Sequence, residues 1–119
     1  MALSLRMTRA RTAVFSIAVL QNGAPLNVTG KTLYFTAKFK VQDADAAAVV
    51  KKSTGSGIVV TDAPNGLATL TINPADTAAL AEKNTQRLVC DVALKDGANV
   101  YELDSGTLDV AGNVTQDTP

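Results

Sequence analysis

The chain contains no histidine and no tryptophan, and it has a single cysteine among its 119 residues. Histidine is the side chain that most often serves as a general base or metal ligand near neutral pH. Without it, only lysine or a carboxylate could activate a serine or cysteine nucleophile, and no spacing in the chain indicates such a pair. We therefore expect a protein that is not an enzyme and that holds no cofactor or metal.

Long apolar runs are also missing. The apolar stretch Ala13–Leu20 is far too short to span a bilayer. It follows three arginines, as in a signal peptide, but Ser16 interrupts it and no small-residue cleavage site comes after it. Cys90 alternates with aliphatic residues, so it is expected to be buried as a small hydrophobe. We expect a protein made in a cytoplasm, with no membrane partner.

Alternation of apolar and polar residues is the main structural signal, and it is clearest in Lys31–Lys40. Turn-forming residues separate this segment from other alternating segments. Further strands are expected at residues 12–20, 49–52 (a short edge strand), 58–61, 67–72, 86–95, 100–103 and 106–110. About seven or eight short strands with frequent turns predict an all-β fold, an antiparallel, immunoglobulin-like β-sandwich.

The segment Gly57–Leu80 predicts a strand, a tight turn, a second strand and a capped helical turn. In the turn, Pro64 fixes φ, and Asn65-Gly66 can adopt positive φ. Asn73 can cap a helix, Pro74 suits its first position and Asp76 can reach back to free amides. These residues predict one short helix of two turns near residues 74–82.

The pattern divides the chain into an N-terminal arm (residues 1–11), a sandwich domain (12–110) and a C-terminal tail (111–119). The arm mixes polar and apolar residues without a clear period, so it is expected to extend to a neighbour or to fray. Deletion of Met1–Thr8 is expected to leave the thermal midpoint nearly unchanged and to abolish incorporation into particles. The tail has too few apolar residues to be held in a core.

Charge is balanced overall but unevenly distributed. Residues 1–52 carry eight basic and two acidic groups, a net charge of +6, and residues 53–119 carry three basic and nine acidic groups, a net charge of −6. Either the two halves intermingle within one sandwich and neutralise each other, or basic surfaces of one copy pack on acidic surfaces of the next.

Three groups of residues are candidates for a metal, phosphate or catalytic site, and in each the sequence argues against that site. Asp43 and Asp45 have the spacing that begins an EF-hand loop, but the third acidic ligand, the glycine and the closing glutamate are missing. Ser53–Gly57 is glycine-rich, yet no Gly-Lys-Ser/Thr follows it. Three carboxylates could meet across adjacent strands, as a glycosidase requires, although their alternation with apolar residues favours solvated side chains. They are Glu102, Asp104 and Asp109.

Nucleic-acid binding is suggested by the basic residues Arg6, Arg9 and Arg11, and by Tyr34 on the same strand face as Lys38. Single-stranded nucleic acid needs aromatic platforms for stacking. The chain has two tyrosines and three phenylalanines, and the phenylalanines are expected in the core. No nucleic-acid partner is therefore expected.

A series of motifs follows in a fixed order between residues 28 and 115. They are Val28-Thr29-Gly30, Asp43-Ala44-Asp45, Gly57-Ile58-Val59-Val60, Gly66, Pro74-Ala75-Asp76-Thr77-Ala78-Ala79-Leu80, Cys90-Asp91-Val92-Ala93-Leu94-Lys95-Asp96-Gly97, Tyr101, Ser105-Gly106-Thr107-Leu108 and Val114-Thr115. This order resembles the small β-sandwich module of tailed-bacteriophage structural proteins, including the N-terminal domain of baseplate upper proteins.

The resemblance implies a non-enzymatic virion structural protein, synthesised in the host bacterial cytoplasm and without a cofactor. In baseplate and fibre proteins the module usually anchors a longer chain, whereas this sequence stops at Pro119. We therefore expect an adaptor of the tail, baseplate or collar, or a capsid decoration subunit. It would be held in a symmetric particle by contacts with other virion proteins and with copies of itself, as a homo-oligomer.

The contacts are expected in the arm, in the tail and in the loop Ala44–Gly57. The candidate interaction residues are Arg6, Arg9, Arg11, Lys51, Lys52 and Tyr34. The alternative is a free-standing carbohydrate- or ligand-binding β-sandwich. Such sites usually use exposed tryptophan or tyrosine, and Tyr34 and Tyr101 are the tyrosines that the chain offers.

Overall fold

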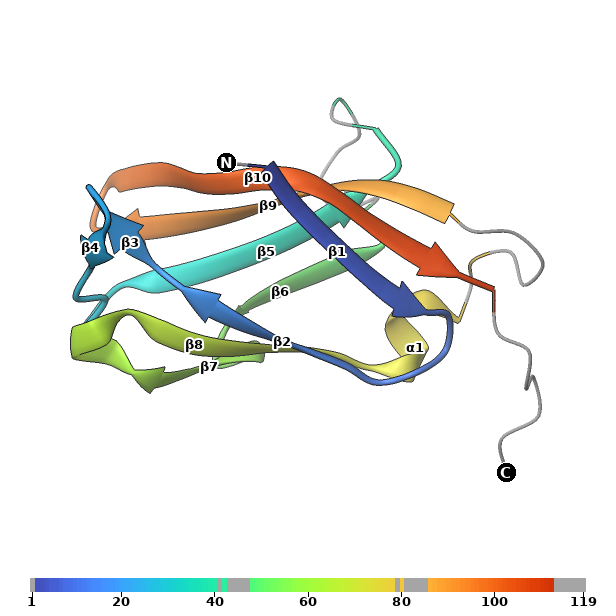
Figure 1. The fold of residues 1–119 in the computed structure, drawn as a ribbon, viewed down its shortest axis with the longest axis horizontal. Helices are drawn as coiled ribbons and strands as arrows, with labels where there is room; N and C mark the ends of the chain where they lie inside the picture. The colour runs from blue at the N-terminus through green and yellow to red at the C-terminus, as the bar shows by residue number, and fades with distance from the viewer. Residues whose placement is uncertain (1, 41, 43–47, 79, 81–85, 113–119) are drawn as a thin grey trace.

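The computed structural model describes residues 2–40, 42, 48–78, 80 and 86–112, and it consists mainly of strands (Figure 1). The strands are β1 (Ala2–Thr8), β2 (Ala13–Ala18), β3 (Leu20–Gln21), β4 (Ala24–Pro25), β5 (Thr32–Lys38), β6 (Val50–Thr54), β7 (Gly57–Asp62), β8 (Leu67–Ile72), β9 (Gln86–Asp96) and β10 (Asn99–Ala111). A 3-10 turn, η2 (Ala63–Asn65), joins β7 to β8, and the helix α1 (Pro74–Thr77) follows β8.

Eight strands form one curled sheet in the order β1-β10-β9-β5-β6-β7-β8-β2, and β3 pairs with β4 in a separate hairpin. Only two residue pairs join β6 to β7, Ser53 with Gly57 and Thr54 with Ile58, so the sheet bends at this corner. The bend produces two layers, a five-stranded layer β1-β10-β9-β5-β6 and a three-stranded layer β7-β8-β2 (Figure 1).

The strand order is that of an immunoglobulin-like sandwich. Strands β10-β9-β5-β6 correspond to the G-F-C-C′ order of variable-type domains, and β2-β8-β7 correspond to B-E-D. The predicted all-β, immunoglobulin-like fold is therefore confirmed. The expectation of a purely antiparallel arrangement is wrong, because β1 runs parallel to β10 and β6 makes its two pairs with β7 in parallel.

The segment expected as an N-terminal arm is a strand of the sandwich over residues 2–8. β1 pairs in register with residues 105–111 of β10. Met7 is buried and Leu5 packs against the core, so the strand contributes apolar side chains to the interior. The expectation of an arm without a clear period is wrong, because Leu3-Ser4-Leu5-Arg6-Met7 alternates with the period of a half-buried strand.

Three other elements differ from expectation. β6 is not an edge strand, because it lies between β5 and β7. The strands expected at residues 100–103 and 106–110 are one strand, β10, which has a register shift between Glu102 and Asp104. The bulge absorbs the extra residue, so Gly106 remains in the strand. Most of the expected tail lies outside the described residues, and Ala111 belongs to β10.

The helix α1 has one turn, Pro74–Thr77, and residues 79, 81 and 82 of the expected helix lie outside the described residues. The Asn73 N–H donates to a carboxylate oxygen of Asp76 at 2.7 Å, as the sequence predicted for its start. At its end, Ala78 and Leu80 use their carbonyls to accept hydrogen bonds from the Arg9 side chain. These carbonyls are thus satisfied without a further helical turn.

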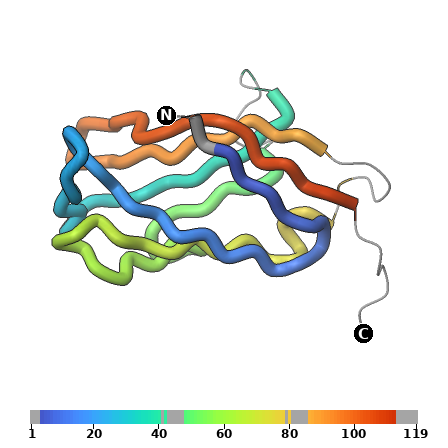
Figure 2. The backbone as a smooth tube through the Cα atoms, in the orientation of Figure 1, coloured from blue at the N-terminus to red at the C-terminus, as the bar shows by residue number. Residues whose placement is uncertain are grey.

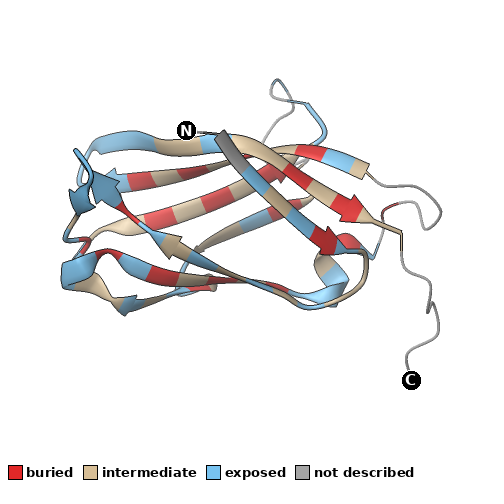
Figure 3. Ribbon diagram, in the orientation of Figure 1, coloured by how far each residue is buried: buried red, intermediate tan, exposed pale blue. Residues whose placement is uncertain are grey.

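The core lies between the two layers, where buried and partly buried residues alternate along β5 and β9 (Figure 3). Phe35 and Leu33 of β5 are fully buried, as are Leu88 of β9 and Leu108 of β10. Each large apolar side chain that is fully buried contributes about 1.5–3 kcal/mol relative to exposure. This alternation leaves the outward side chains of both layers available at the surface.

The chain turns from β1 into β2 beside α1, as the trace in Figure 2 shows. The Arg9 N–H donates to the Ala111 carbonyl at 2.8 Å, and Ala10 has a positive φ of 56°. The Ala10 N–H donates to the hydroxyl of the buried Thr77 at 2.9 Å. Hydrogen bonds therefore connect the turn both to the end of β10 and to α1.

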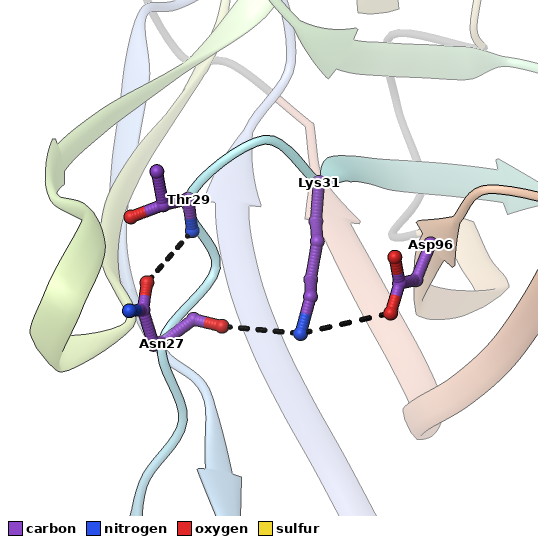
Figure 4. Close-up of polar contacts among 4 residues, drawn as sticks. All are labelled: Asn27, Thr29, Lys31 and Asp96. Atoms are coloured by element: carbon purple, nitrogen blue, oxygen red, sulfur yellow. Dashed lines mark hydrogen bonds and ion pairs between the residues drawn. The ribbon is translucent and has the colours of Figure 1, made fainter.

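At the opposite end, the connection between β4 and β5 is fastened by polar contacts (Figure 4). The Thr29 N–H donates to the Asn27 side-chain oxygen at 2.9 Å. The Lys31 ammonium donates to the Asn27 carbonyl at 3.3 Å and lies 3.8 Å from Asp96 at the end of β9. The Lys31–Asp96 ion pair joins a basic residue from the first half of the sequence to an acidic residue from the second half.

Candidate functional site

The outward side chains of the five-stranded layer form a charged face. The strand register aligns them in rows that cross the layer. The charged face comprises Ser4 and Arg6 of β1, Glu102, Ser105, Thr107 and Asp109 of β10, Arg87, Val89, Asp91, Ala93 and Lys95 of β9, Tyr34, Thr36 and Lys38 of β5, and Lys51 and Ser53 of β6. Five of these side chains are basic and three are acidic, so the face has both signs of charge and a net charge of +2.

The centre of the charged face is a shallow depression of about 750 Å³. Tyr34 and Lys51 line it, together with Lys38, Asp91 and Glu102. Four different strands, β5, β6, β9 and β10, therefore contribute to one surface, although their residues are far apart in the sequence. Backbone hydrogen bonding fixes these strands relative to one another, so the depression is largely preformed.

A group of carboxyls lies at the β10 side of this depression. Burial raises the pKa of Glu102 above its ordinary value of 4.5, and so do the nearby charge and hydrogen bond of Asp91 and the charge of Asp104. Protonation of Glu102 is thus favoured relative to a solvated carboxyl, and the protonated group can donate a hydrogen bond to Asp91. Such a pair can accept cationic groups or hydrogen-bond donors from a bound molecule.

The three carboxylates considered from the sequence as a catalytic set are not brought together. Asp109 lies in another row, where Arg87 donates to its two carboxylate oxygens at 2.9 and 3.2 Å. This hydrogen bond lowers the pKa of Asp109, and the charges of Arg87 and Arg6 lower it further. Desolvation of the carboxylate acts in the opposite direction but is outweighed. Asp109 therefore belongs to a row of charges, Arg6-Asp109-Arg87, that crosses β1, β10 and β9, and Arg87 is its ion-pair partner.

Two of the six residues expected to mediate interactions, Tyr34 and Lys51, share the depression. Arg6 lies on the same charged face but opposite Asp109. The signal that could have identified their neighbours was the alternation itself. It places Thr36 and Lys38 on the side of Tyr34, and Asp91 on the face opposite Cys90.

The other three expected interaction residues have contacts within the chain. The Arg9 Nε–H donates to the Leu80 carbonyl at 2.7 Å, and its Nη2 donates to the Ala78 carbonyl. Arg11 donates to the Ala10 carbonyl at 3.1 Å. Lys52 forms an ion pair of 2.8 Å with Asp76, and its side chain is only 12% exposed. Arg9 and Lys52 thus stabilise the surroundings of α1.

These ion pairs bear on the uneven charge distribution. Lys31 and Lys52 come from the basic first half of the sequence, and each pairs with an aspartate of the acidic second half. The register also places Arg6 opposite Asp109. In the described residues, the two halves intermingle and neutralise each other within one sandwich.

Cys90 is buried on the inward side of β9, as the sequence predicted. Burial, together with the charges of Asp91 and Asp104, raises the pKa of its thiol to about 11. The thiolate is the reactive form of cysteine. Cys90 is therefore held in its unreactive thiol form near neutral pH.

Other segments weighed from the sequence contribute little to the site. Asp43 and Asp45, with residues 44–47 of the expected contact loop, lie outside the described residues. The glycine-rich Ser53–Gly57 forms the corner between β6 and β7. Within the described part of the chain, no three histidine, cysteine, aspartate or glutamate side chains gather as a metal site. No helix there is long and apolar enough to cross a membrane.

Comparison with known proteins gives similarity in structure alone. No protein-family model matches the chain, and no curated protein matches it. The N-terminal domain of phage TP901-1 ORF48 is similar over 94% of this chain and 84% of that domain, with 18% identity and a TM-score of 0.46. At this TM-score, the similarity assigns neither fold nor function.

The natural killer cell receptor NKp44 is also similar in structure. The match covers 95% of this chain and 99% of the receptor chain, with 12% identity and a TM-score of 0.50. At this identity the similarity concerns the fold alone. It agrees with the strand order that identifies an immunoglobulin-like sandwich.

Proposed function

We propose that the chain is a non-enzymatic structural protein of a bacteriophage virion, made in the host bacterial cytoplasm. It acts as an adaptor of the tail, baseplate or collar, or as a capsid decoration subunit. The phage assignment rests on the order of motifs between residues 28 and 115, from Val28-Thr29-Gly30 to Val114-Thr115. An immunoglobulin-like sandwich is compatible with that module, although this fold serves many functions.

The observation that carries a contact function is the arrangement of charges on the charged face. Lys51, Asp91 and Glu102 come from three strands and surround a shallow depression instead of a deep cleft. Charges of both signs, alternating over a preformed sheet, give specificity towards a protein surface with the complementary pattern. We therefore place the contact with another virion protein on this face.

The contact is tested with a charge reversal. Lys51 is an exposed residue of the charged face, so Lys51→Glu leaves the core intact and reverses one contact charge. In particles assembled without the chain and then supplied with it, we expect Lys51→Glu to be incorporated about tenfold less than the wild type.

Asn99→Glu is the matched control, because Asn99 is exposed at the start of β10 and does not line the depression. It should be incorporated like the wild type. Equal incorporation of both variants would remove the charged face from the proposal, and equal loss of both would show that the effect is nonspecific.

The second candidate is a carbohydrate- or ligand-binding module. The observation that favours it is that Tyr34 and Val100 both line the depression, where an aromatic ring and an apolar side chain could contact a sugar. A glycan array tests this function, with Tyr34→Ala as the control variant. Specific binding that Tyr34→Ala abolishes would support the module, and absence of binding by the folded wild type would count against it.

A further inference from the structure

The outward side chains of the three-stranded layer differ from the charged face, because Asp62 at the end of β7 is the only charged residue among them. This uncharged face consists of Val14, Ser16 and Ala18 of β2, Leu67, Thr69 and Thr71 of β8, and Val59 and Thr61 of β7. The register places Ser16, Thr69 and Val59 in one row across the layer, with Val14 opposite Thr71 in the next row. The side chains therefore form a continuous surface.

The uncharged face also exposes large apolar side chains. Val14 is 62% exposed, Val59 is 63% exposed and Leu67 is 41% exposed. Single exposed apolar residues are normal on protein surfaces, but a contiguous patch marks an interaction site. The three residues come from three adjacent strands and lie in three successive rows, with Ser16, Thr69 and Thr71 between them.

The edge strand of this face, β2, lacks the usual protection of sheet edges. β2 hydrogen-bonds only to β8 in the described sheet, and β7 adds only two pairs with β6 to its pairing with β8. Edge strands commonly carry lysine or proline to prevent association. The residues of β2, Ala13–Ala18, contain neither. The sequence of this layer is typical of a surface that is covered by another protein chain.

We propose that the uncharged face binds the same face of a second copy of this chain. A two-fold interface brings identical surfaces together, so a net charge on the surface is repelled by the same net charge on the partner. The uncharged face avoids this repulsion. The charged face, with its net charge of +2, does not. Burial of hydroxyl and aliphatic groups also involves no loss of hydration from a charge.

Charges at the ends of the layer determine how the two copies are oriented. Arg11 precedes β2 at one end, and Asp62 ends β7 at the other, because Asp62 pairs with Leu67 and Leu67 pairs with Ala18. Two copies related by an axis perpendicular to the strands place Arg11 of each copy near Asp62 of the other. An axis along the strands would place like charges together, so we expect the first arrangement.

The size of the face sets the strength of the contact. Three strands about 4.8 Å apart, each with about six residues, outline roughly 300 Å². Stable interfaces bury about 800 Å² per partner, so the dimer is expected to have a dissociation constant between about 100 µM and 1 mM. Such a contact becomes occupied when copies are held close together.

The dimer does not depend on the proposed virion function, and its test uses the isolated chain.

The first test measures association of the full chain in solution. Sedimentation velocity and ¹⁵N relaxation between about 20 µM and 1 mM should show a concentration-dependent dimer, since this range brackets the expected constant. Val59→Lys should weaken it at least about tenfold, because a charge is placed within the uncharged face. A wild type that remains monomeric at the highest concentration would overturn the proposal.

Thr107→Lys is the matched control, because it adds the same side chain to the charged face. Melting curves confirm that both variants are folded. The Thr107→Lys variant should associate like the wild type. A dimer that persists in Val59→Lys, or one that Thr107→Lys weakens equally, would contradict an interface on the uncharged face.

A charge exchange tests the orientation. Arg11→Asp and Asp62→Arg should each weaken the dimer, and the double variant should restore it, because the opposite charges are again near each other. Failure of the double variant to recover, with all three chains folded, would overturn the antiparallel arrangement.

Discussion

Gly66 is the residue whose identity is most strictly required by its surroundings. It lies between η2 and β8 with a φ of 68°, and its carbonyl accepts a hydrogen bond from the Val19 N–H at 2.8 Å. A Cβ atom there would lie 2.5 Å from the Leu26 carbonyl oxygen and 2.8 Å from that of Val19. The sequence predicted the positive φ, but not the backbone that approaches it from the β3–β4 hairpin.

Gly66→Ala is expected to lower the free energy of unfolding by about 2–5 kcal/mol, combining left-handed strain with overpacking. Gly97→Ala is the matched control. Gly97 has a φ of 61° and no atom within 4 Å of the place that a methyl group would take, so only the strain of about 1–2 kcal/mol applies. Urea denaturation measures both variants. Equal losses would show that the close approach contributes nothing.

Glu102 makes the stability depend on pH. Its pKa is raised in the folded protein, so it stabilises the fold below its ordinary pKa of 4.5, and this contribution is lost as the pH rises through the raised value. Glu102→Gln remains neutral and should melt at a higher temperature than the wild type at about pH 7 and at a similar temperature at about pH 3.

Asp109→Asn is the control of opposite sign. The pKa of Asp109 is lowered by Arg87, so its contribution is present above its ordinary pKa of 3.8 and is lost as the pH falls through the lowered value. The variant should melt below the wild type at neutral pH and approach it in acid. If both variants change in the same direction at neutral pH, the assigned carboxyl environments are wrong.

At the scale of elements, the best predicted strands were those with unbroken alternation. β5 and β8 lie within a residue or two of their expected bounds, because burial on one face and turn residues at the ends determine both. β1 was mistaken for an arm, since nothing local indicates that it pairs in parallel with a strand about 100 residues later. The site was missed in part for the same reason, because the neighbours of Tyr34 come from strands distant in the sequence.

β1 is expected to contribute to stability through its own residue Met7, whose side chain is buried in the core. Met7→Ala should lower the free energy of unfolding by about 2–5 kcal/mol, since it leaves a cavity in the core. Ser4→Ala on the same strand is the control, because Ser4 is exposed. Chemical denaturation that finds no loss for Met7→Ala would instead support the arm expected from the sequence.

The turn between β1 and β2 depends on the buried hydroxyl of Thr77, which accepts a hydrogen bond from the Ala10 N–H. Thr77→Val keeps the shape but leaves this amide unpaired, which should lower the free energy of unfolding by about 1–3 kcal/mol. Thr77→Ser keeps the acceptor and should retain more of the stability. Thermal melts compare the two, and a variant Thr77→Val as stable as Thr77→Ser would exclude this role.

At the scale of the whole molecule, the two outer faces have different characters. The five-stranded layer presents interleaved charges around Tyr34 and Lys51, whereas the three-stranded layer presents Val14, Thr69 and Val59 without charge. The sequence predicted the sandwich but not this division, because each face combines residues from several strands. We propose that the charged face contacts another protein, while the uncharged face pairs copies of the chain.

The most direct test of the virion function is to quantify this chain in purified phage particles. Mass spectrometry of peptides, with the major capsid protein as the internal standard, gives its copy number per particle. The proposal predicts a fixed copy number that matches a symmetric ring or shell and survives further purification. Absence of the chain from purified particles, while it accumulates in the lysate, would contradict the account.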